Sequence, residues 1–288
     1  MRIFHDCIPC FIRQTIEAVR MVTDDEDILE DVLREILQVT SKIDFNNNAP
    51  YMGRIIHRRV KELTNCSDPY KEVKERFNQA AMEQYDKLKE MIIKSDNPFL
   101  AAIKVSIAGN IIDFGVRADI TEKEVKETIE DCLNHELVFN SAEELKMAVN
   151  QADRILFLGD NAGEIVFDKL LLQTMPVEKI TYVVKGRPII NDATIEDAIK
   201  IKMNEVVRVI DNGSDVPGTI LELCSPEFNQ EYEKADLIIA KGQGNYETLS
   251  EVRDKEIFFL LKVKCPVIAR DIGCEVGDIV LKQTREGE

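Results

Sequence analysis

The first third of the chain has the hydrophobic pattern of helices. From residue 8 to about residue 96, glycine is almost absent, helix-forming residues dominate, and apolar side chains recur at three- and four-residue spacing, as at Ile28, Val32 and Ile36. Turn-forming sequences interrupt this pattern at residues 24–25, 45–50, 66–69 and 95–98. These breaks predict about four or five helices. We therefore assign residues 1–98 to an α-helical N-terminal domain.

A different pattern begins at Ile155. The apolar run Ile155–Leu158 is typical of a strand that is covered on both faces, as in a parallel sheet flanked by helices. Further apolar runs follow at residues 179–185, 206–210, 235–240, 257–261 and 266–269. Helical stretches separate most of these runs, and the last two are expected to pair with each other. This alternation predicts an α/β fold with a doubly wound, largely parallel sheet, which we assign to residues 99–288.

Polar residues follow the first predicted strand, at the place where such sheets bind ligands. The chain continues with Asp160 and Asn161 and enters a predicted helix after Gly163. Asp160 or Asn161 could simply cap that helix, since both residue types are favoured caps. Two more polar sequences, GRPIINDAT and KGQGNYE, follow the second and fourth apolar runs. Because the ends of parallel strands meet at one sheet edge, this repetition favours a binding site over separate caps.

The residue types at this sheet edge predict a divalent cation. Carboxylate and amide oxygens are hard ligands, suited to Mg²⁺, Mn²⁺ or a similar ion such as Co²⁺ or Ni²⁺. We assign Asp160, Asn161 and Asp192 as the metal ligands. So few ligands leave positions open for water and substrate, which suits a cation that polarises a phosphoryl group and generates hydroxide. The reaction that fits is phosphoester hydrolysis by metal-activated water, because Asp160 lies in no D-x-D pair of the kind used for aspartyl-phosphate chemistry.

A phosphate group would be held by residues beside these ligands. Lys241, at the end of a predicted strand, offers a compact cation, and Gly242 after it offers open backbone. The amides of Gly163 and Glu164, at the start of the predicted helix, would point the same way. The predicted catalytic residues are Asp160, Asn161, Asp192 and Lys241, and the predicted substrate-binding residues at this edge are Gly163, Glu164, Asn191 and Gly242.

A helix is also predicted from residue 99 to residue 115. Its small residues suggest close packing, and Asn110 and Asp113 lie three residues apart, so they would share one helical face. Polar groups on an otherwise apolar helix need partners when they are buried. These two residues are therefore either internal hydrogen-bonding or capping groups, or one wall of the active site.

Composition limits the partners of this protein. The chain has 288 residues, of which 44% are hydrophobic, enough for one large core or two modest ones. Its formal charge of -16 argues against nucleic acid as a partner, because phosphate backbones need a basic surface. No apolar run approaches the ~20 residues of a membrane helix, and MRIFHDCIPC has no signal-peptide pattern. We expect a soluble cytoplasmic protein that binds a small phosphorylated metabolite but neither nucleic acid nor a membrane, with its oligomeric state left open.

The cysteines have no obvious single role. There are seven, spread over a long chain, unlike the dense, even-numbered sets of disulfide-rich secreted domains. Cys7 and Cys10 form a C-x-x-C pair, with His5 just before it. A zinc site built from these three residues would lack a fourth ligand, and thioredoxin-like pairs follow a strand instead of opening a helical region. The pair is either packed at a helix start or has a metal or redox role completed by distant residues.

Taken together, the motifs resemble those of one protein family. C-x-x-C near the start, AGNIIDFG, GDNAGE, KGRPIINDAT and KGQGNYE occur in that order. Over nearly its whole length the chain resembles the damage-control metal-dependent phosphatases, the former domain-of-unknown-function family 89 (ARMT1-like), and specifically their cysteine-containing archaeal and bacterial branch. The resemblance implies a helical N-terminal domain packed on a three-layer α/β/α domain.

The same resemblance implies a set of roles. A divalent cation would be held by Asp160, Asn161 and Asp192. Lys241 and Asn245 would face the phosphate, and the cleft would include Asn110 and Asp113. Members of this family hydrolyse phosphates of small, often damaged metabolites, such as sugar phosphates, nucleotides and pantetheine phosphates.

Two other classes of function fit parts of the sequence. The turn LGDNAGE follows a strand much as the loop of an S-adenosylmethionine-dependent methyltransferase does. Dinucleotide-type loops, however, need G-x-G-x-x-G, and this turn has only Gly159 and Gly163. A non-catalytic metal or metabolite sensor, with the C-x-x-C pair reporting redox state, is the other alternative. Metal-dependent phosphate release, retention of a methyl donor, and ligand binding without turnover distinguish the three.

Overall fold

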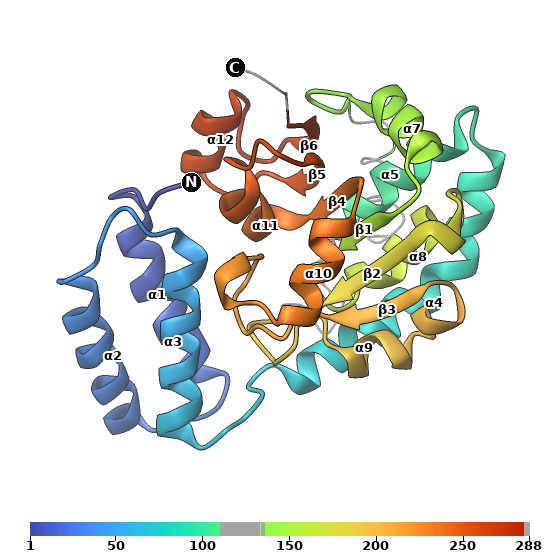
Figure 1. Ribbon diagram of the computed structural model, residues 1–288. Helices are drawn as coiled ribbons and strands as arrows, with labels where there is room; N and C mark the ends of the chain where they lie inside the picture. The colour runs from blue at the N-terminus through green and yellow to red at the C-terminus, as the bar shows by residue number, and fades with distance from the viewer. Residues whose placement is uncertain (110–132, 134–135, 285–288) are drawn as a thin grey trace.

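The computed structural model describes residues 1–109, 133 and 136–284, and in these ranges six strands form one sheet (Figure 1). Their order across the sheet is β3-β2-β1-β4-β5-β6. The strands are β1 (Ile155–Leu158), β2 (Ile180–Val184), β3 (Arg208–Asp211), β4 (Leu237–Lys241), β5 (Glu256–Lys262) and β6 (Ile279–Gln283). Strands β1 to β5 are parallel, and β6 pairs antiparallel with β5. The predicted α/β class and largely parallel sheet are confirmed.

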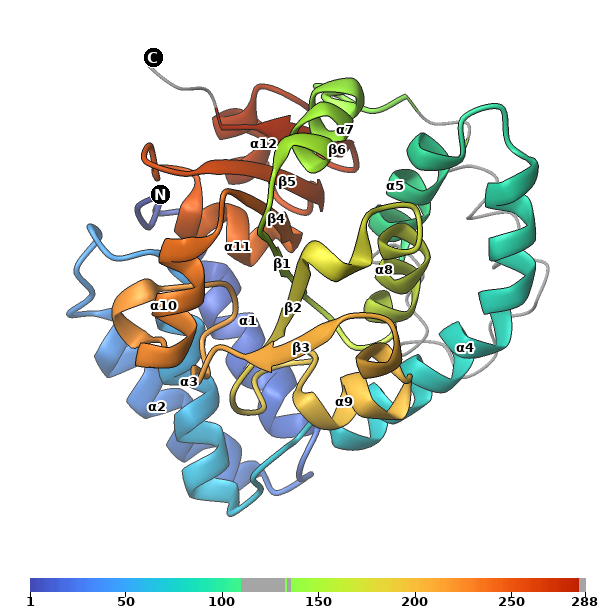
Figure 2. The same ribbon diagram turned by 45° about the vertical axis from the view of Figure 1, so that its right-hand side comes forward.

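Helices cover both faces of the sheet, so the α/β part has three layers (Figures 1 and 2). On one face lie α4 (Lys71–Lys94), α5 (Pro98–Ala108), α7 (Ala142–Gln151), α8 (Glu164–Leu172) and α9 (Ile195–Lys200). On the other lie α10 (Pro226–Lys234), α11 (Gly242–Leu249) and α12 (Pro266–Ile272). Short 3₁₀ turns occur at Val177–Lys179, Met203–Glu205 and Leu221–Leu223. Strand β1 is buried on both faces, with Phe157 in one core and Leu158 in the other, as its unbroken apolar run predicts.

The first three helices have a core of their own. They are α1 (Cys7–Arg20), α2 (Glu26–Thr40) and α3 (Ala49–Thr64), and their buried side chains include Phe11, Val32 and Ile56. Side chains at the predicted breaks cap two of these helices. Asp25 accepts from backbone N–H groups at the start of α2, and Asn48 does so for α3. Of the helices in the described ranges, none has the length and apolar character needed to cross a bilayer.

Helix α4 packs with the sheet. Its buried residues Ala81, Leu88 and Ile92 belong to the same core as strand β1 and helix α8. The division at residue 98 stays a prediction. The packing of α4 leads us to propose a boundary between α3 and α4 instead.

One predicted strand is wrong. The apolar run at residues 266–269 belongs to helix α12, and the partner of β5 is β6, which the sequence pattern did not identify. Pro266 stands at the first position of α12, where its missing N–H costs nothing, and Gly273 ends the helix with a positive φ of 85°. A run of only a few apolar residues fits a buried helix as well as a strand, so periodicity could not decide between them.

Candidate active site

Two loops at the carboxyl edge of the sheet are hydrogen-bonded to each other. The turn after β1 and the loop after β2 meet through Ala162 N–H, which donates to the Asn191 carbonyl at 2.9 Å, and Ala193 N–H, which donates to the Asp160 carbonyl at 2.8 Å. Between these bonds, Asn161 and Asp192 pair as an antiparallel bridge. The predicted ligands Asp160, Asn161 and Asp192 therefore lie side by side, although they are about 30 residues apart in the chain.

The two aspartates are buried together, and this changes their acidity. Burial raises the pKa of Asp160 to about 7, and the nearby carboxylate of Asp192 adds to the shift. Burial also raises the pKa of Asp192 to about 6, although the ammonium of Lys185 works against it. Two like charges held in a poorly solvated place are costly unless a positive charge joins them.

The residues present fit a divalent cation. Asp192 is only 3% exposed, and its Oδ2 has no hydrogen-bond partner among the described residues, although Nζ of Lys185 lies 3.5 Å away. A buried carboxylate oxygen without such a partner is unusual, and a bound ion would satisfy it. Within the described ranges, no three His, Cys, Asp or Glu side chains form a metal-binding group. The predicted site therefore needs the amide oxygen of Asn161 as its third protein ligand.

Hydrogen bonds orient the amide of Asn161. Its Nδ2 donates to Oδ2 of Asp160 at 2.9 Å and to Oε2 of Glu164 at 3.1 Å. With both N–H groups used in this way, the nitrogen end faces the carboxylates and the oxygen end faces away from them. A cation shared with Asp160 would require the amide oxygen to turn toward the carboxylate side, so the role of Asn161 as a ligand stays a prediction.

Lys241 lies beneath the site and is fully enclosed. Its side chain is 0% exposed, and its Nζ donates to the Ser106 carbonyl at 3.0 Å, to Oε1 of Glu164 at 2.6 Å and to Oδ1 of Asp168 at 2.5 Å. An ammonium group has three protons, so these bonds use all of them. A contact between Lys241 and phosphate stays a prediction, and it would require Lys241 to exchange one of these partners.

The other predicted substrate-binding residues also have internal roles. Gly163 N–H donates to Oδ1 of Asn78 at 2.7 Å, so this amide is already paired. Asn245 accepts from Thr219 and donates to the carbonyl of Lys241. Their contacts with a substrate, like that of Asn191, stay predictions. Asn110 and Asp113 lie outside the described residues.

Gly242 lies against Asp160, where there is no room for a side chain. It has a positive φ of 79°, and a Cβ built on it would lie 2.0 Å from Oδ2 of Asp160. The start of helix α11 can therefore approach the carboxylate only because this residue is glycine. Glu164 also belongs to the site, because burial raises the pKa of its carboxyl to about 7 while Lys241 opposes the shift.

Sequence reasoning missed three contributing residues. Lys185 is buried and donates from Nζ to the Gly218 carbonyl at 2.5 Å, beside Asp192. It directly follows strand β2, much as Lys241 ends strand β4, so its position could have identified it. Asp168 and Asn78 had no local signal, since each stands within an ordinary helix pattern.

The C-x-x-C pair lies in the first turn of helix α1. Cys7 is half-buried, Cys10 is exposed, and neither forms a disulfide. Burial raises the pKa of the Cys7 thiol, and Glu247 and Cys265 add to this shift. Fewer thiolates are therefore present at neutral pH than in an ordinary cysteine. The role of the pair stays open.

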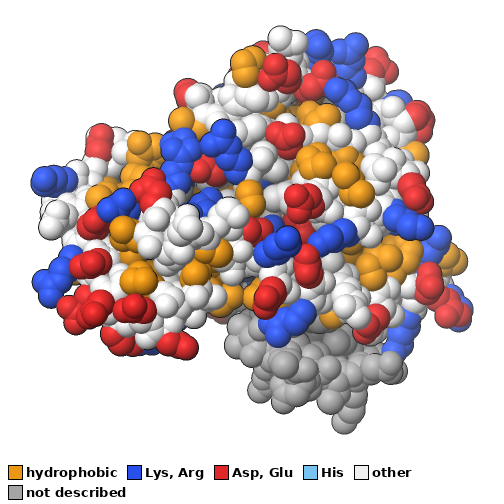
Figure 3. All heavy atoms as spheres, turned by 90° about the horizontal axis from the view of Figure 1, so that it is seen from below, with side chains coloured by type: hydrophobic (Ala, Val, Ile, Leu, Met, Phe, Trp, Pro, Cys, Tyr) orange, Lys and Arg blue, Asp and Glu red, His pale blue; other side chains and the backbone are white. Residues whose placement is uncertain are grey.

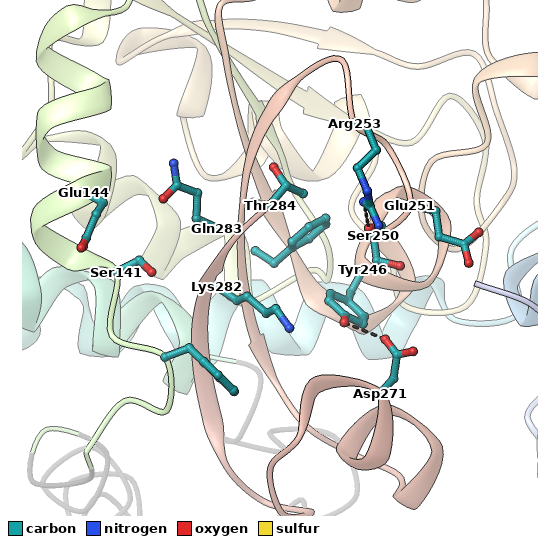
Figure 4. A pocket seen from close by; sticks show the side chains of 12 residues that line it. Ser141, Glu144, Tyr246, Ser250, Glu251, Arg253, Asp271, Lys282, Gln283 and Thr284 are labelled. Carbon is teal, nitrogen blue, oxygen red and sulfur yellow. Dashed lines mark hydrogen bonds between the residues drawn. The ribbon is translucent and has the colours of Figure 1, made fainter. Parts of the chain in front are cut away.

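A cavity of about 580 Å³ lies elsewhere, among helices α11 and α12 and the end of strand β6 (Figure 4). There the hydroxyl of Tyr246 donates to Oδ2 of Asp271 at 2.7 Å. None of the predicted site residues lines this cavity. The loops that hold Asp160 and Asp192 are therefore the better candidate site, despite the size of the cavity.

The chain is similar to several known proteins. The family model described as damage-control phosphatase ARMT1-like domain matches residues 3–280. An uncharacterised protein of Methanocaldococcus jannaschii is 42% identical, over 98% of this chain and 95% of its own. A protein of Archaeoglobus fulgidus named damage-control phosphatase is 38% identical, over 98% of this chain and 99% of its own.

Comparison of the folds also identifies a protein of this family. The crystal structure of a DUF89 family protein from Pyrococcus horikoshii superimposes with a TM-score of 0.92 at 34% identity, covering 99% of this chain and 100% of that one. This chain therefore matches the Pyrococcus horikoshii protein in fold and in sequence over almost the full length of each. The chain belongs to the family of damage-control phosphatase ARMT1-like domains.

Proposed function

We propose that this protein hydrolyses phosphate esters of small metabolites at a divalent-cation site formed by Asp160, Asn161 and Asp192. The observation that carries the proposal is the pair of buried aspartates: Oδ2 of Asp192 has only the ammonium of Lys185 near it, at 3.5 Å, and Asp160 lies close enough to interact with it electrostatically. The relative named damage-control phosphatase supports the type of reaction. A bound cation would supply Lewis acidity and the positive charge that offsets both the aspartates and a phosphoryl group.

The remaining residues act by holding these ligands. Lys241 binds Glu164, and Glu164 in turn accepts from Nδ2 of Asn161, which fixes the asparagine side chain beside Asp160. Lys185 places a second ammonium beside Asp192 and contributes positive charge where an anionic substrate would bind.

Local charge matters here because the protein as a whole is acidic. Basic and acidic side chains are interspersed on the face shown in Figure 3. With a formal charge of -16, the molecule does not attract anions in general. The substrates that we propose are therefore small phosphorylated compounds, such as sugar phosphates or nucleotides, that a bound cation can capture in the cytoplasm. The cation would be Mg²⁺, Mn²⁺, Co²⁺ or Ni²⁺.

The test is phosphate release after removal of bound metal by a chelator. Sugar phosphates, nucleotides and p-nitrophenyl phosphate would each be assayed without metal and with each of the four cations. We expect release only when a cation is added, and the rates would rank the substrates. Folded protein that binds Mn²⁺ but releases no phosphate under any condition would contradict hydrolysis and favour a sensor.

A further inference from the structure

Through one side chain, helix α4 contacts both the turn after β1 and the start of helix α9, which follows the loop that carries Asp192. Figures 1 and 2 show α4 beside α8 and α9, the helices that follow these loops. Asn78 of α4 is 4% exposed. Its Oδ1 accepts from Gly163 N–H at 2.7 Å, and its Nδ2 donates to Oδ1 of Asp197 at 3.0 Å. One amide therefore joins the turn after β1 to the helix after β2.

The first contact lies two residues beyond Asn161. Gly163 has a positive φ of 80°, and a Cβ built on it would lie 2.9 Å from Cβ of Phe77, so the turn passes close against α4. Its N–H stands at the start of α8, where no carbonyl of the same helix can accept it. Asn78 supplies the acceptor and so fixes this turn to α4.

The second contact lies just beyond Asp192. Asp197 caps α9, because its Oδ2 accepts from the N–H of Thr194 at 2.9 Å and from the hydroxyl of Thr194 at 2.8 Å. Its other oxygen accepts from Asn78. The start of α9, and with it the end of the loop that carries Asp192, is thereby fixed to the same residue of α4.

We propose that Asn78 is a positioning residue that sets the separation between the Asp160–Asn161 turn and Asp192. This inference rests on the proposed function, since its consequence is the affinity of the cation site. The two buried aspartates repel each other when the cation is absent, so their spacing has to be held by groups outside the site. Only a side chain that can both donate and accept, as an amide does, makes both contacts of Asn78.

The first test replaces Asn78 by leucine, which has a similar size but no hydrogen-bonding group. We expect the dissociation constant for Mn²⁺, measured by electron paramagnetic resonance, to rise about 10- to 100-fold, the usual effect of losing a group that orients metal ligands. Hydrogen exchange at the Gly163 amide should also become faster in the metal-free protein. The matched control is Leu88→Ala, because Leu88 is equally buried in α4 but lies about 15 Å further along the helix. It should lower the melting temperature and leave Mn²⁺ affinity unchanged.

The second test reverses the polarity of one hydrogen bond. Asn78→Asp places two carboxylates side by side, and Asp197→Asn leaves two amides whose facing groups are both donors. In the double variant the contact between residues 78 and 197 can form again with donor and acceptor exchanged, the carboxylate at 78 can still accept from Gly163 N–H, and the total charge is that of the wild type. Each single variant should weaken Mn²⁺ binding, and the double variant should bind within about threefold of the wild type.

These outcomes separate the inference from the function on which it rests. Unchanged Mn²⁺ affinity in Asn78→Leu, or a double variant no better than the weaker single variant, would overturn the positioning role. Wild-type protein that binds no Mn²⁺ would overturn the proposed cation site and this inference with it. Binding of Mn²⁺ without hydrolysis would contradict the proposed reaction alone, because affinity still measures the position of the ligands.

Discussion

At the residue scale, burial determines what the charged and titratable side chains of this protein do. Asp160, Asp192 and Glu164 all have raised pKa values because they are removed from water. Lys241 is equally buried but pairs with two carboxylates, which raise its pKa against the effect of burial. Charged groups in such positions are expensive, and their presence at one sheet edge is a mark of function more than of stability.

Removing one predicted ligand should abolish activity without unfolding the protein. Asp192→Asn keeps the size of the side chain but removes the charge that attracts a cation. We expect kcat/KM for the best phosphoester substrate to fall more than about 100-fold, with an unchanged circular dichroism spectrum. Asp271→Asn, at the cavity whose lining includes none of the predicted site residues, is the control and should retain activity. Full activity in Asp192→Asn would rule out its role as a ligand.

His57 should make stability depend on pH. Its ring is 1% exposed, neither nitrogen has a hydrogen-bond partner among the described residues, and burial lowers its pKa from 6.5 to about 4. Since the folded-state pKa lies below the unfolded one, the neutral form favours folding above pH 6.5. That stability is lost as pH falls toward 4.

Urea unfolding at pH 7 and pH 5 would measure this effect. Between these two values the wild type should lose up to about 2 kcal/mol through His57, beyond what other groups contribute. His57→Phe, which can keep the edge-to-face contact with Tyr70, should lack that part of the loss. Equal losses in the two proteins would show that His57 does not titrate as its burial predicts.

At the element scale, the ends of helices and strands build the site. Helix α11 begins at Gly242 because only glycine allows the backbone to lie against Asp160. Helix α8 begins beside the same carboxylate, and α9 follows Asp192. Each element contributes its first residues, so small displacements of these helices would change the ligand geometry.

Two glycines allow that claim to be tested. Gly242→Ala and Gly273→Ala both place a side chain at a positive φ, but a Cβ at Gly273 would meet nothing within 4 Å. Gly273→Ala should lose about 1 to 2 kcal/mol of unfolding free energy through backbone strain, and Gly242→Ala should lose more because its Cβ also overlaps Asp160. Only Gly242→Ala should also lose Mn²⁺ binding and phosphatase activity. Equal activity in the two variants would contradict close support of Asp160 by the start of α11.

Helix α3 is joined to the loop after β3 by a pair of arginines. Burial alone would raise the pKa of Asp215, but hydrogen bonds from Arg58 and Arg54 outweigh it and lower the pKa to about 2. The folded-state pKa is depressed, so this stabilisation is present above pH 3.8 and is lost as pH falls toward 2.

Asp215→Asn should therefore destabilise the protein at pH 7. We expect a loss of about 1 to 3 kcal/mol, less than for a fully buried pair because Arg58 is partly exposed. Glu231→Gln, which removes the more exposed pair with Arg208, is the control and should cost at most about 1 kcal/mol. Urea unfolding of both variants at pH 7 would decide, and equal losses would show that the α3 contact has no special role.

At the scale of the whole molecule, the site joins parts that are distant in the chain. Helix α4, the turn after β1, the loop after β2 and the start of α11 all meet at one edge of the sheet. Binding a cation there should stabilise the complete fold, because unfolded chains do not hold these ligands together.

Mn²⁺ should therefore raise the melting temperature. At a concentration of 100 times its dissociation constant, the ion would add about 2.7 kcal/mol, or a shift of about 5 °C or more. Differential scanning calorimetry of metal-free and Mn²⁺-loaded protein would measure this shift. In Asp192→Asn the shift should disappear. A similar shift in that variant would place the bound Mn²⁺ elsewhere.

The sequence by itself determined the local elements and the edge of the sheet where polar residues gather. Strand β1 was predicted from an unbroken apolar run that ends at a turn beginning with Gly159, and Asp160 could be placed because it directly follows that run. The run at residues 266–269 was misassigned, since a few apolar residues suit either element until their neighbours are known.

Only the tertiary structure decided which polar groups form hydrogen bonds and which residues are their partners. Sequence suggested that Lys241 holds a phosphate oxygen, and only the folded structure shows that the Ser106 carbonyl, Glu164 and Asp168 surround its ammonium group. Asn78 could not be identified at all, because its two partners are more than 80 residues away in the chain. Local patterns reflect short-range periodicity, but burial and hydrogen bonding depend on contacts between distant segments, which exist only once the chain has folded.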